Sequence, residues 1–348
     1  MSQQKLTIAL TGLNNHDSPG PGIPVARALR EMKGYSVRII GLCYESMEPG
    51  LFMHDLIDRS YLIPYPHAGN SSLLHRLREI HEKEQFDLII PNFDAELKGF
   101  IAAQETFESW GVRTFLPSLQ QLQEREKVNL PVFGNRYAVA VPDSQPVFQV
   151  EDIRTLAGRF GFPLVVKGQF YEAEVVQNYD QAVKAFFKIS GTWGLPIVVQ
   201  KFVHGLELNV VAIGDGEGNT LGMVPMRKRY TTAKGKAWAG ITIDDPELMA
   251  FATDLIRKTR WKGPLELELI KDTEGNFQVL EINPRFPAWV YLANGAGQNL
   301  PARLVEAALG KTPQSEADYA VGKMFIRYSY DLICDRSEFE TLAALGEG

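Results

Sequence analysis

The sequence predicts an α/β layer followed by an α+β region, and two observations support this prediction. First, strand-like apolar runs alternate with helix-like segments over the first part of the chain, an order typical of parallel sheets covered by helices. Second, the later strand-like runs follow one another around glycine-containing turns, which favours antiparallel ribbons. A length of 348 residues suits two or three domains. We expect them at residues 1–116, 117–205 and 206–348.

Composition excludes several classes of protein. Hydrophobic residues make up 45% and charged residues 22%, an ordinary globular balance. The net charge of −6 argues against a general nucleic-acid binder, because phosphate contacts need clustered Lys and Arg. Two cysteines, Cys43 and Cys334, provide no disulfide framework and suit a reducing cytoplasm. Neither a signal peptide nor a run of roughly 20 apolar residues is evident. We therefore expect a cytoplasmic protein that binds no membrane.

The N-terminal part has the order of a doubly wound sheet. Ligands of such sheets bind at the carboxyl ends of the strands, so loops 12–22 and 91–96 are candidates for a site. The first loop is glycine-rich but lacks the G-x-G-x-x-G spacing, and we interpret it as a loop that faces the cleft, with His16 and Asp17 as weak candidates. The expected elements are strands over 5–13, 35–44 and 86–93 and helices over 23–34 and 72–85.

Asp94 and Glu96 follow directly after the strand expected at 86–93. One interpretation is that they hold a substrate amine. The other is that Asp94 caps a helix and Glu96 lies in its first turn. Further along, the expected elements are strands over 162–170, 172–178, 195–203 and 323–334 and helices over 179–190, 245–260 and 299–310.

Residues 265–286 combine acidic and apolar residues in a strand-like alternation. Residues two apart on a strand share a face, so Glu266 and Glu268 point one way and the leucines beside them point the other way. A tight turn in DTEGN brings Glu268 close to Glu281 and Asn283. Two carboxylates and an amide oxygen are the hard ligands that Mg²⁺ prefers, and without a cation the carboxylates would repel each other. The alternative is an ordinary solvated hairpin face.

This spacing resembles the ATP-grasp superfamily, closest to the ligase domains related to carbamoyl-phosphate synthetase large chains and biotin carboxylase. The resemblance implies that Glu268, Glu281 and Asn283 hold two Mg²⁺ ions, or Mn²⁺ in their place, on the phosphates of ATP. The form EINPR, which includes Arg285, is fairly specific to this branch. The resemblance covers roughly 117–310 and implies an ATP-grasp fold of two subdomains after a Rossmann-like domain.

Other segments resemble the nucleotide site of that family, in the expected order. The lysine after VV is similar to the strand lysine on the α- and β-phosphates, and VVQKFVHGLELNV resembles the hinge that pairs with adenine and ribose. MRKRY resembles the basic strand, where Arg227 or Lys228 would face the transferred phosphate. The resemblance implies nucleotide-binding residues Lys127, Lys167, Gln200, Lys201, Phe202, Val203 and Glu207, and catalytic residues Lys167, Arg227 and Arg285.

Two departures from the family pattern bear on function. The segment KGQFYEAEVV has one glycine where relatives have a glycine-rich phosphate loop, and Glu172 and Glu174 would repel a triphosphate if they faced it. After NPR, the aromatic residues Phe286, Trp289 and Tyr291 either line a substrate pocket or belong to the core.

The resemblance implies an ADP-forming ligase in which a small-molecule carboxylate is activated as an acylphosphate and an amine then displaces phosphate. Two alternatives stay open. One is activation of bicarbonate of the carbamoyl-phosphate or carboxylase type, and the other is nucleotide binding without turnover. A homodimer is a further expectation, because dimers are common among relatives.

Overall fold

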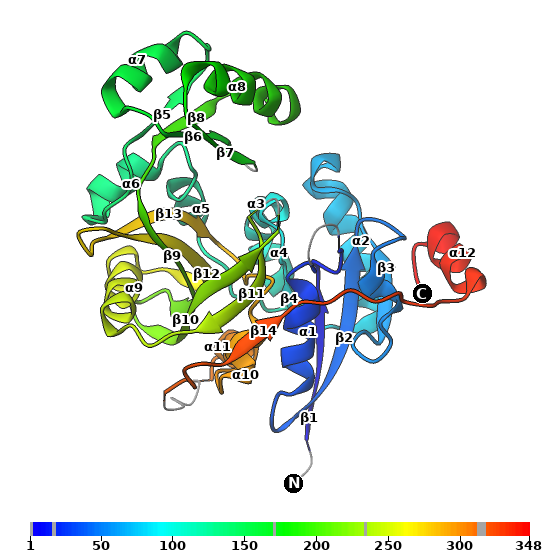
Figure 1. The fold of residues 1–348 in the computed structure, drawn as a ribbon. Coiled ribbons are helices and arrows are strands. Elements are labelled where there is room, and N and C mark those ends of the chain that lie inside the picture. Colours follow the sequence, from blue (N-terminus) through cyan, green and yellow to red (C-terminus); the bar gives the residue numbers. More distant parts are fainter. Residues whose placement is uncertain (1–2, 16–18, 170–171, 233–234, 312–317) are drawn as a thin grey trace.

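The computed structural model describes residues 3–15, 19–169, 172–232, 235–311 and 318–348. Figure 1 shows an N-terminal parallel sheet, a large antiparallel sheet beside it, and a small lid above the large sheet. His16 and Asp17 lie outside the described residues. No helix in the described ranges is long and apolar enough to span a membrane.

The N-terminal sheet is parallel, as the alternation of strands and helices predicts. Its strand order is β3-β2-β1-β4, so the chain reverses direction across the sheet between β1 and β4, where doubly wound sheets bind ligands. The strands are β1 (Gln4–Leu10), β2 (Tyr35–Cys43), β3 (Arg59–Leu62) and β4 (Leu88–Ile90), and the helices are α1 (Gly22–Arg30), α2 (Asn70–Glu84), α3 (Asp94–Ala102) and α4 (Gln104–Ser109), with short 3-10 helices at Pro49–Phe52 and Pro66–Ala68.

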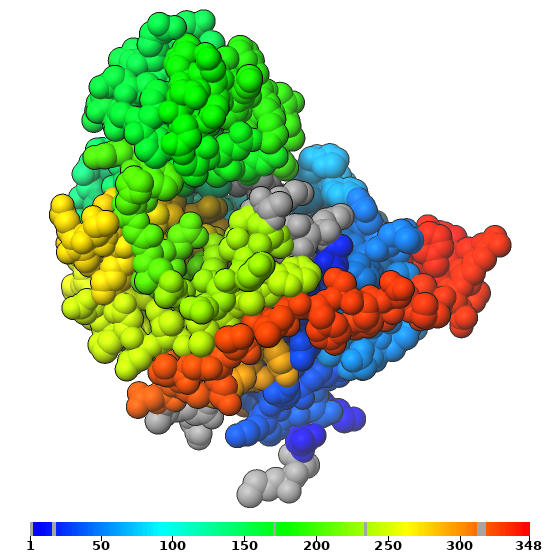
Figure 2. All heavy atoms as spheres, viewed as in Figure 1, coloured from blue at the N-terminus to red at the C-terminus, as the bar shows by residue number. Residues whose placement is uncertain are grey.

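The lid is a four-stranded antiparallel sheet with two helices, and it forms a distinct lobe in Figure 2. Its core joins the helices to the sheet through side chains such as Ile153, Phe186 and Val199. The strands are β5 (Ser144–Val147), β6 (Leu164–Gly168), β7 (Ala173–Val176) and β8 (Ile197–Lys201), and the helices are α7 (Asp152–Phe160) and α8 (Tyr179–Trp193).

The first part of the domain expected at 117–205 packs against the large sheet and not within the lid. It contains α5 (Leu119–Glu124) and α6 (Leu130–Tyr137). Leu130 and Phe133 are buried in the core under the large sheet rather than in the lid core. The lid itself therefore begins near β5.

The large sheet has the order β13-β12-β9-β10-β11-β14. The acidic hairpin forms one edge of this sheet, and its acidic side chains lie on one face. Leu265, Leu267 and Leu269 are fully buried against α9, so the predicted alternation is confirmed. The elements are β9 (Gly205–Asp215), β10 (Thr220–Thr231), β11 (Ala237–Thr242), α9 (Pro246–Thr259), β12 (Lys262–Asp272), β13 (Phe277–Asn283), α10 (Tyr291–Gly295), α11 (Leu300–Ala308) and β14 (Met324–Ile326).

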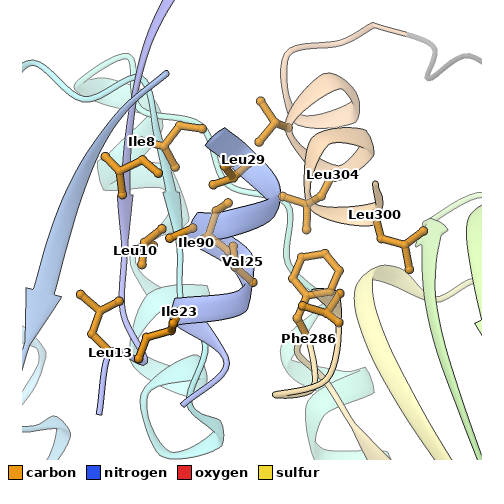
Figure 3. Close-up of a cluster of buried hydrophobic side chains, with 14 of the residues drawn as sticks. Ile8, Leu10, Leu13, Ile23, Val25, Leu29, Ile90, Phe286, Leu300 and Leu304 are labelled. Carbon is orange, nitrogen blue, oxygen red and sulfur yellow. The ribbon is translucent and has the colours of Figure 1, made fainter. Parts of the chain in front are cut away.

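One hydrophobic core joins the N-terminal sheet to the large sheet. Figure 3 shows Val25 and Leu29 of α1 beside Leu304 of α11, with Phe286 below them. Phe286 is fully buried and Trp289 is 5% exposed, so these two aromatic residues belong to the core rather than to an open pocket. The hydroxyl of Tyr291 bonds to Glu31 of the N-terminal part, so this aromatic residue also joins the two parts.

The strand expected at 323–334 is wrong in length. Only Met324–Ile326 form β14, because only these residues pair with β11. The chain then runs across the molecule to the N-terminal sheet, as Figure 1 shows, and forms α12 (Arg336–Leu345). At its end, Gly348 and Ser60 exchange two backbone hydrogen bonds of 2.9 Å. The last residues of the expected domain 206–348 therefore pack on the N-terminal sheet.

Candidate functional site

The acidic hairpin brings the three expected cation ligands together. In the register of β12 and β13, Glu268 lies opposite Glu281, and Glu266 lies opposite Asn283. Asn283 Nδ2 lies 3.4 Å from Glu268 Oε1. The ladder is irregular just after Glu268, a feature common beside functional sites.

Each expected carboxylate ligand has a lysine partner from another element. Lys228 Nζ on β10 lies 3.3 Å from Glu268 Oε2, and Lys127 Nζ, between α5 and α6, lies 3.5 Å from Glu281 Oε1. Burial raises the pKa of Glu268, but the ammonium of Lys228 and the guanidinium of Arg285 outweigh it and leave the pKa below its usual value. The carboxylate of Glu268 is therefore ionised at neutral pH.

Lys167 is a buried cation at the end of β6, on the lid side of the site. It is 8% exposed. Burial lowers the pKa of its ammonium group to about 8, although Glu281, Glu268 and Glu207 act in the opposite direction. Lys167 therefore lies near the same two carboxylates, Glu268 and Glu281, that pair with Lys228 and Lys127. Its ammonium group is mostly charged at neutral pH.

The expected adenine hinge is the segment that joins the lid to the large sheet. Gln200, near the end of β8, is 3% exposed. Lys201 N donates to Asp143 O at 2.8 Å. Phe202 and Val203 are half-buried between β8 and β9. Glu207 on β9 is largely exposed, and its Oε2 lies 3.9 Å from Lys228 Nζ.

Lys228, not Arg227, reaches the acidic face of the sheet. Neighbouring residues of a strand point to opposite faces, so the contact between Lys228 and Glu268 places Arg227 on the face covered by α9. Of Arg227 and Lys228, the two residues that the resemblance offers for the transferred phosphate, Lys228 is therefore the one that lies on the acidic face. The sequence MRKRY cannot decide between them, because the choice depends on which side of β10 faces the site.

Arg285 is engaged by Asp94 rather than open as an anion-binding fork. Arg285 Nε donates to Asp94 Oδ2 at 2.8 Å, and Arg125 approaches Asp94 Oδ1 at 3.2 Å. Burial raises the pKa of Asp94, but the two guanidinium groups hold it below its usual value. Asp94 is the first residue of α3, so it connects the N-terminal sheet to the end of β13.

Glu96 acts within the N-terminal fold, as the helix interpretation predicts. It accepts hydrogen bonds from Asn92 N at 2.8 Å and Phe93 N at 2.9 Å, and from the hydroxyls of Thr11 and Tyr44. Phe93, not Asp94, is the N-cap residue of α3. Burial raises the pKa of Glu96 to about 7, despite these four donors. The substrate-amine interpretation fits neither Glu96 nor Asp94, because both are engaged by protein groups.

Sequence reasoning did not assign a role to a buried group behind the expected ligands. Glu266 is 5% exposed and accepts from Trp289 Nε1 at 2.6 Å and from Asn209 Nδ2 at 3.0 Å. Burial raises the pKa of Glu266 to about 7, and the nearby charge of Glu268 acts in the same direction. One signal was available, because Asn209 interrupts the apolar run of β9.

The ends of β6 and β7 are bonded to each other on either side of residues 170 and 171. Gly168 N donates to Glu172 O at 3.0 Å, and Lys167 pairs with Ala173. Glu174 is bound to Lys188 of α8 at 2.5 Å, which neutralises its charge. Phe170 and Tyr171 lie outside the described residues.

The donor set fits a Mg²⁺ ion that also binds a ligand. Carboxylate and amide oxygens are its preferred donors, and Mg²⁺ usually takes one or two protein carboxylates beside substrate phosphates. Within the part of the chain that the structure describes, no three His, Cys, Asp or Glu side chains form a complete metal cage.

The chain is similar in sequence to known proteins. Residues 195–328 match the family described as "ATP-grasp in the biosynthetic pathway with Ter operon". The chain is 27% identical over 213 residues to the carbamoyl phosphate synthase large chain of Caldanaerobacter subterraneus subsp. tengcongensis, covering 57% of this chain and 19% of that protein. It is 25% identical over 307 residues to the same enzyme of Rubrobacter xylanophilus, covering 79% and 27%. The chain thus spans about a fifth to a quarter of these relatives.

Solved structures share the fold. The biotin carboxylase domain of Hydrogenobacter thermophilus 2-oxoglutarate carboxylase, in complex with MgADP and bicarbonate, has a TM-score of 0.69 at 15% identity over 91% of this chain and 73% of that one. The L-amino acid ligase of Bacillus licheniformis has a TM-score of 0.65 at 15% identity over 88% and 75%. At this identity, the likeness establishes the mixed α/β fold alone.

Proposed function

We propose that the chain is an ADP-forming carboxylate–amine ligase of the ATP-grasp superfamily, because residues 195–328 match an ATP-grasp family and the similar proteins include carbamoyl phosphate synthase large chains and a biotin carboxylase. One observation carries the proposal. Glu268, Glu281 and Asn283 meet on one face of the large sheet, beside three lysines from separate elements.

The nucleotide would lie between the lid and the large sheet. The backbone from Lys201 to Val203, after Gln200 and including Phe202, would pair with adenine, and Glu207 would accept hydrogen bonds from the ribose. Lys167 and Lys127 would bind phosphate oxygens, since the buried Lys167 and the half-buried Lys127 are cations beside the acidic face. The N-terminal parallel sheet would be the Rossmann-like domain of this arrangement.

Glu268, Glu281 and Asn283 are the residues that would hold Mg²⁺, as two ions or with Mn²⁺ in their place. The bound cation would neutralise phosphate charge and orient the phosphate oxygens for in-line transfer.

This chain's residues would act by positioning and by charge. A substrate carboxylate attacks the γ-phosphate, which leaves ADP and an acylphosphate. An amine then attacks the acyl carbon and expels phosphate. Lys167 and Lys228 would stabilise negative charge as it spreads over the transferred group, and Arg285 would orient an anionic substrate after exchange with Asp94.

One observation favours an alternative of a different class. The segment KGQFYEAEVV after Val166 contains one glycine, so its backbone has less freedom than a glycine-rich loop to bring N–H groups close to phosphate. Nucleotide binding without turnover is therefore the second candidate. Bicarbonate activation is a third, because a structural neighbour was solved with bicarbonate.

Release of ADP, measured with amino acids singly and in pairs and with bicarbonate alone, separates these three candidates. Turnover that needs both a carboxylate and an amine supports the ligase. Turnover with bicarbonate alone supports the third candidate, and tight ATP binding without ADP release supports the second. Absence of Mg²⁺-dependent ATP binding contradicts all three.

The site assignment is tested by Glu281→Ala. We expect ~10²–10³-fold slower ADP release with an unchanged fold, because the carboxylate holds charge rather than packing the core. Glu274→Ala, in the exposed turn of the same hairpin, is the matched control and should keep full activity.

A homodimer is also proposed, since one structural neighbour is described as a dimer, and light scattering tests it.

A further inference from the structure

Glu266 lies directly behind the expected cation ligands and has no role in the proposed chemistry. It is 5% exposed and accepts hydrogen bonds from three side chains. Trp289 Nε1 and Asn209 Nδ2 donate to Oε1, at 2.6 and 3.0 Å, and Asn283 Nδ2 donates to Oε2 at 3.1 Å. A buried carboxylate is costly to retain unless it is fully hydrogen-bonded, so this arrangement requires a reason.

The contact with Glu266 determines which way the amide of Asn283 faces. The structure places Asn283 Nδ2 beside Glu266 Oε2, and this is the orientation that an ionised carboxylate requires, because its oxygens only accept hydrogen bonds. Glu268 Oε1, at 3.4 Å, favours the same orientation. The oxygen Oδ1 is then the amide atom that remains for a cation. A rotated amide would present N–H groups to the cation and weaken its binding.

Two further side chains hold Glu266 itself. Trp289 is 5% exposed and packs in the core that contains Phe286, so its indole N–H has a fixed position. Asn209 lies on β9, next to β12 in the sheet, and is 1% exposed. Both donors act on Oε1, whereas Oε2 accepts from Asn283 and lies 4.0 Å from Arg285 Nη1.

We propose that Glu266, held by Trp289 and Asn209, is a positioning residue that keeps the amide oxygen of Asn283 directed at the bound cation. The inference rests on the proposed function, which supplies the cation. Partners behind metal ligands commonly orient those ligands, and their loss typically weakens metal binding about 10–100-fold.

The test measures binding of Mn²⁺ in the presence of ADP, by electron paramagnetic resonance of free Mn²⁺, which does not depend on turnover. The variants are Glu266→Gln, Asn283→Asp, the double variant that combines them, and Trp289→Phe. Glu274→Gln on the exposed turn is the matched control. The melting temperature of each metal-free variant is measured in parallel.

We expect Glu266→Gln to weaken Mn²⁺ binding about 10–100-fold, because a second amide now faces Asn283. The control should bind like the wild type. The double variant should restore most of the loss, because the amide introduced at position 266 can then donate to the carboxylate introduced at position 283. Trp289→Phe should weaken binding less than Glu266→Gln does.

The inference is overturned if Glu266→Gln binds Mn²⁺ as tightly as the wild type does. It is also overturned if the double variant does not restore the affinity that Glu266→Gln loses. A lower melting temperature with unchanged Mn²⁺ affinity also overturns it, since that pattern indicates a purely structural role. If Glu266→Gln does not fold, unchanged affinity in Trp289→Phe is the refuting result. Failure of the wild type to bind Mn²⁺ with ADP would overturn the proposed function as well, whereas the other outcomes leave that function standing.

Discussion

Asp94→Asn tests the contact that joins the N-terminal sheet to the site. Asp94 lies between Arg285, at 2.8 Å, and Arg125, at 3.2 Å, and its side chain is 16% exposed. Breaking a buried ion pair from one side costs about 3–5 kcal/mol. The asparagine keeps the shape and one acceptor oxygen, so we expect a loss of about 2–3 kcal/mol in the free energy of unfolding.

The corresponding shift in melting temperature follows from the size of the chain. An unfolding entropy of about 2.1 cal/mol/K per residue over 348 residues is about 0.7 kcal/mol/K, so the melting temperature should fall by about 3–4 °C. Circular dichroism during heating measures it. The pKa of Asp94 is depressed in the folded state, so its contribution is present above its unfolded value of 3.8 and is lost as the pH falls through the folded pKa.

Asp254→Asn is the matched control, because Asp254 also has two basic partners. Arg257 and Lys258 lie 2.5 and 2.8 Å away, but the Asp254 side chain is 42% exposed and all three residues belong to one helix. An exposed pair of this kind is worth under about 1 kcal/mol. Equal losses in Asp94→Asn and Asp254→Asn would refute the reasoning, since burial would then make no difference.

Two pH dependences follow from the buried groups. The pKa of Lys167 is lowered to about 8, so ATP should bind about tenfold more weakly at pH 9 than at pH 7, measured by calorimetry. Lys167→Met should abolish that dependence, and a persisting dependence would count against the assignment. The pKa of Glu96 is raised to about 7, so its stabilising effect is complete below its unfolded value of 4.5 and is lost as the pH rises through 7. The free energy of unfolding of Glu96→Gln, relative to that of the wild type, should therefore rise by about 2 kcal/mol between pH 5.5 and pH 8, measured by urea unfolding. A difference that stays constant over this pH range would contradict the reasoning.

Local features of the fold and site were predictable from the sequence. The alternation in β12 fixes which side Glu268 faces, and a short hairpin turn fixes its partner at Glu281. The alternation of strands and helices likewise predicted the parallel N-terminal sheet. These inferences succeed because they depend on residues close together in the chain.

Features that depend on distant residues were not predictable. Arg285 and Asp94 are 191 positions apart, and their pairing follows from how the N-terminal sheet docks on the large one. The choice of Lys228 over Arg227 depends on which face of β10 lies toward the site. The course of the C-terminal segment depends on the free edge of β3, which accepts Gly346–Gly348 from the far end of the chain.

The pairing of lysines with the acidic face explains why a hairpin of the large sheet carries carboxylates. Glu268 and Glu281 would repel each other, and Lys228 and Lys127 offset that repulsion in the absence of a nucleotide. A nucleotide phosphate chain and its cation offer a better match, because the carboxylates can then turn to the cation while the lysines turn to phosphate oxygens. Buried charges without partners are costly, so the carboxylates and the lysines must exchange partners together. The same ion pairs thus tie the α5–α6 segment to the large sheet, and under the proposed function they would favour a ligand that is both anionic and cation-bound.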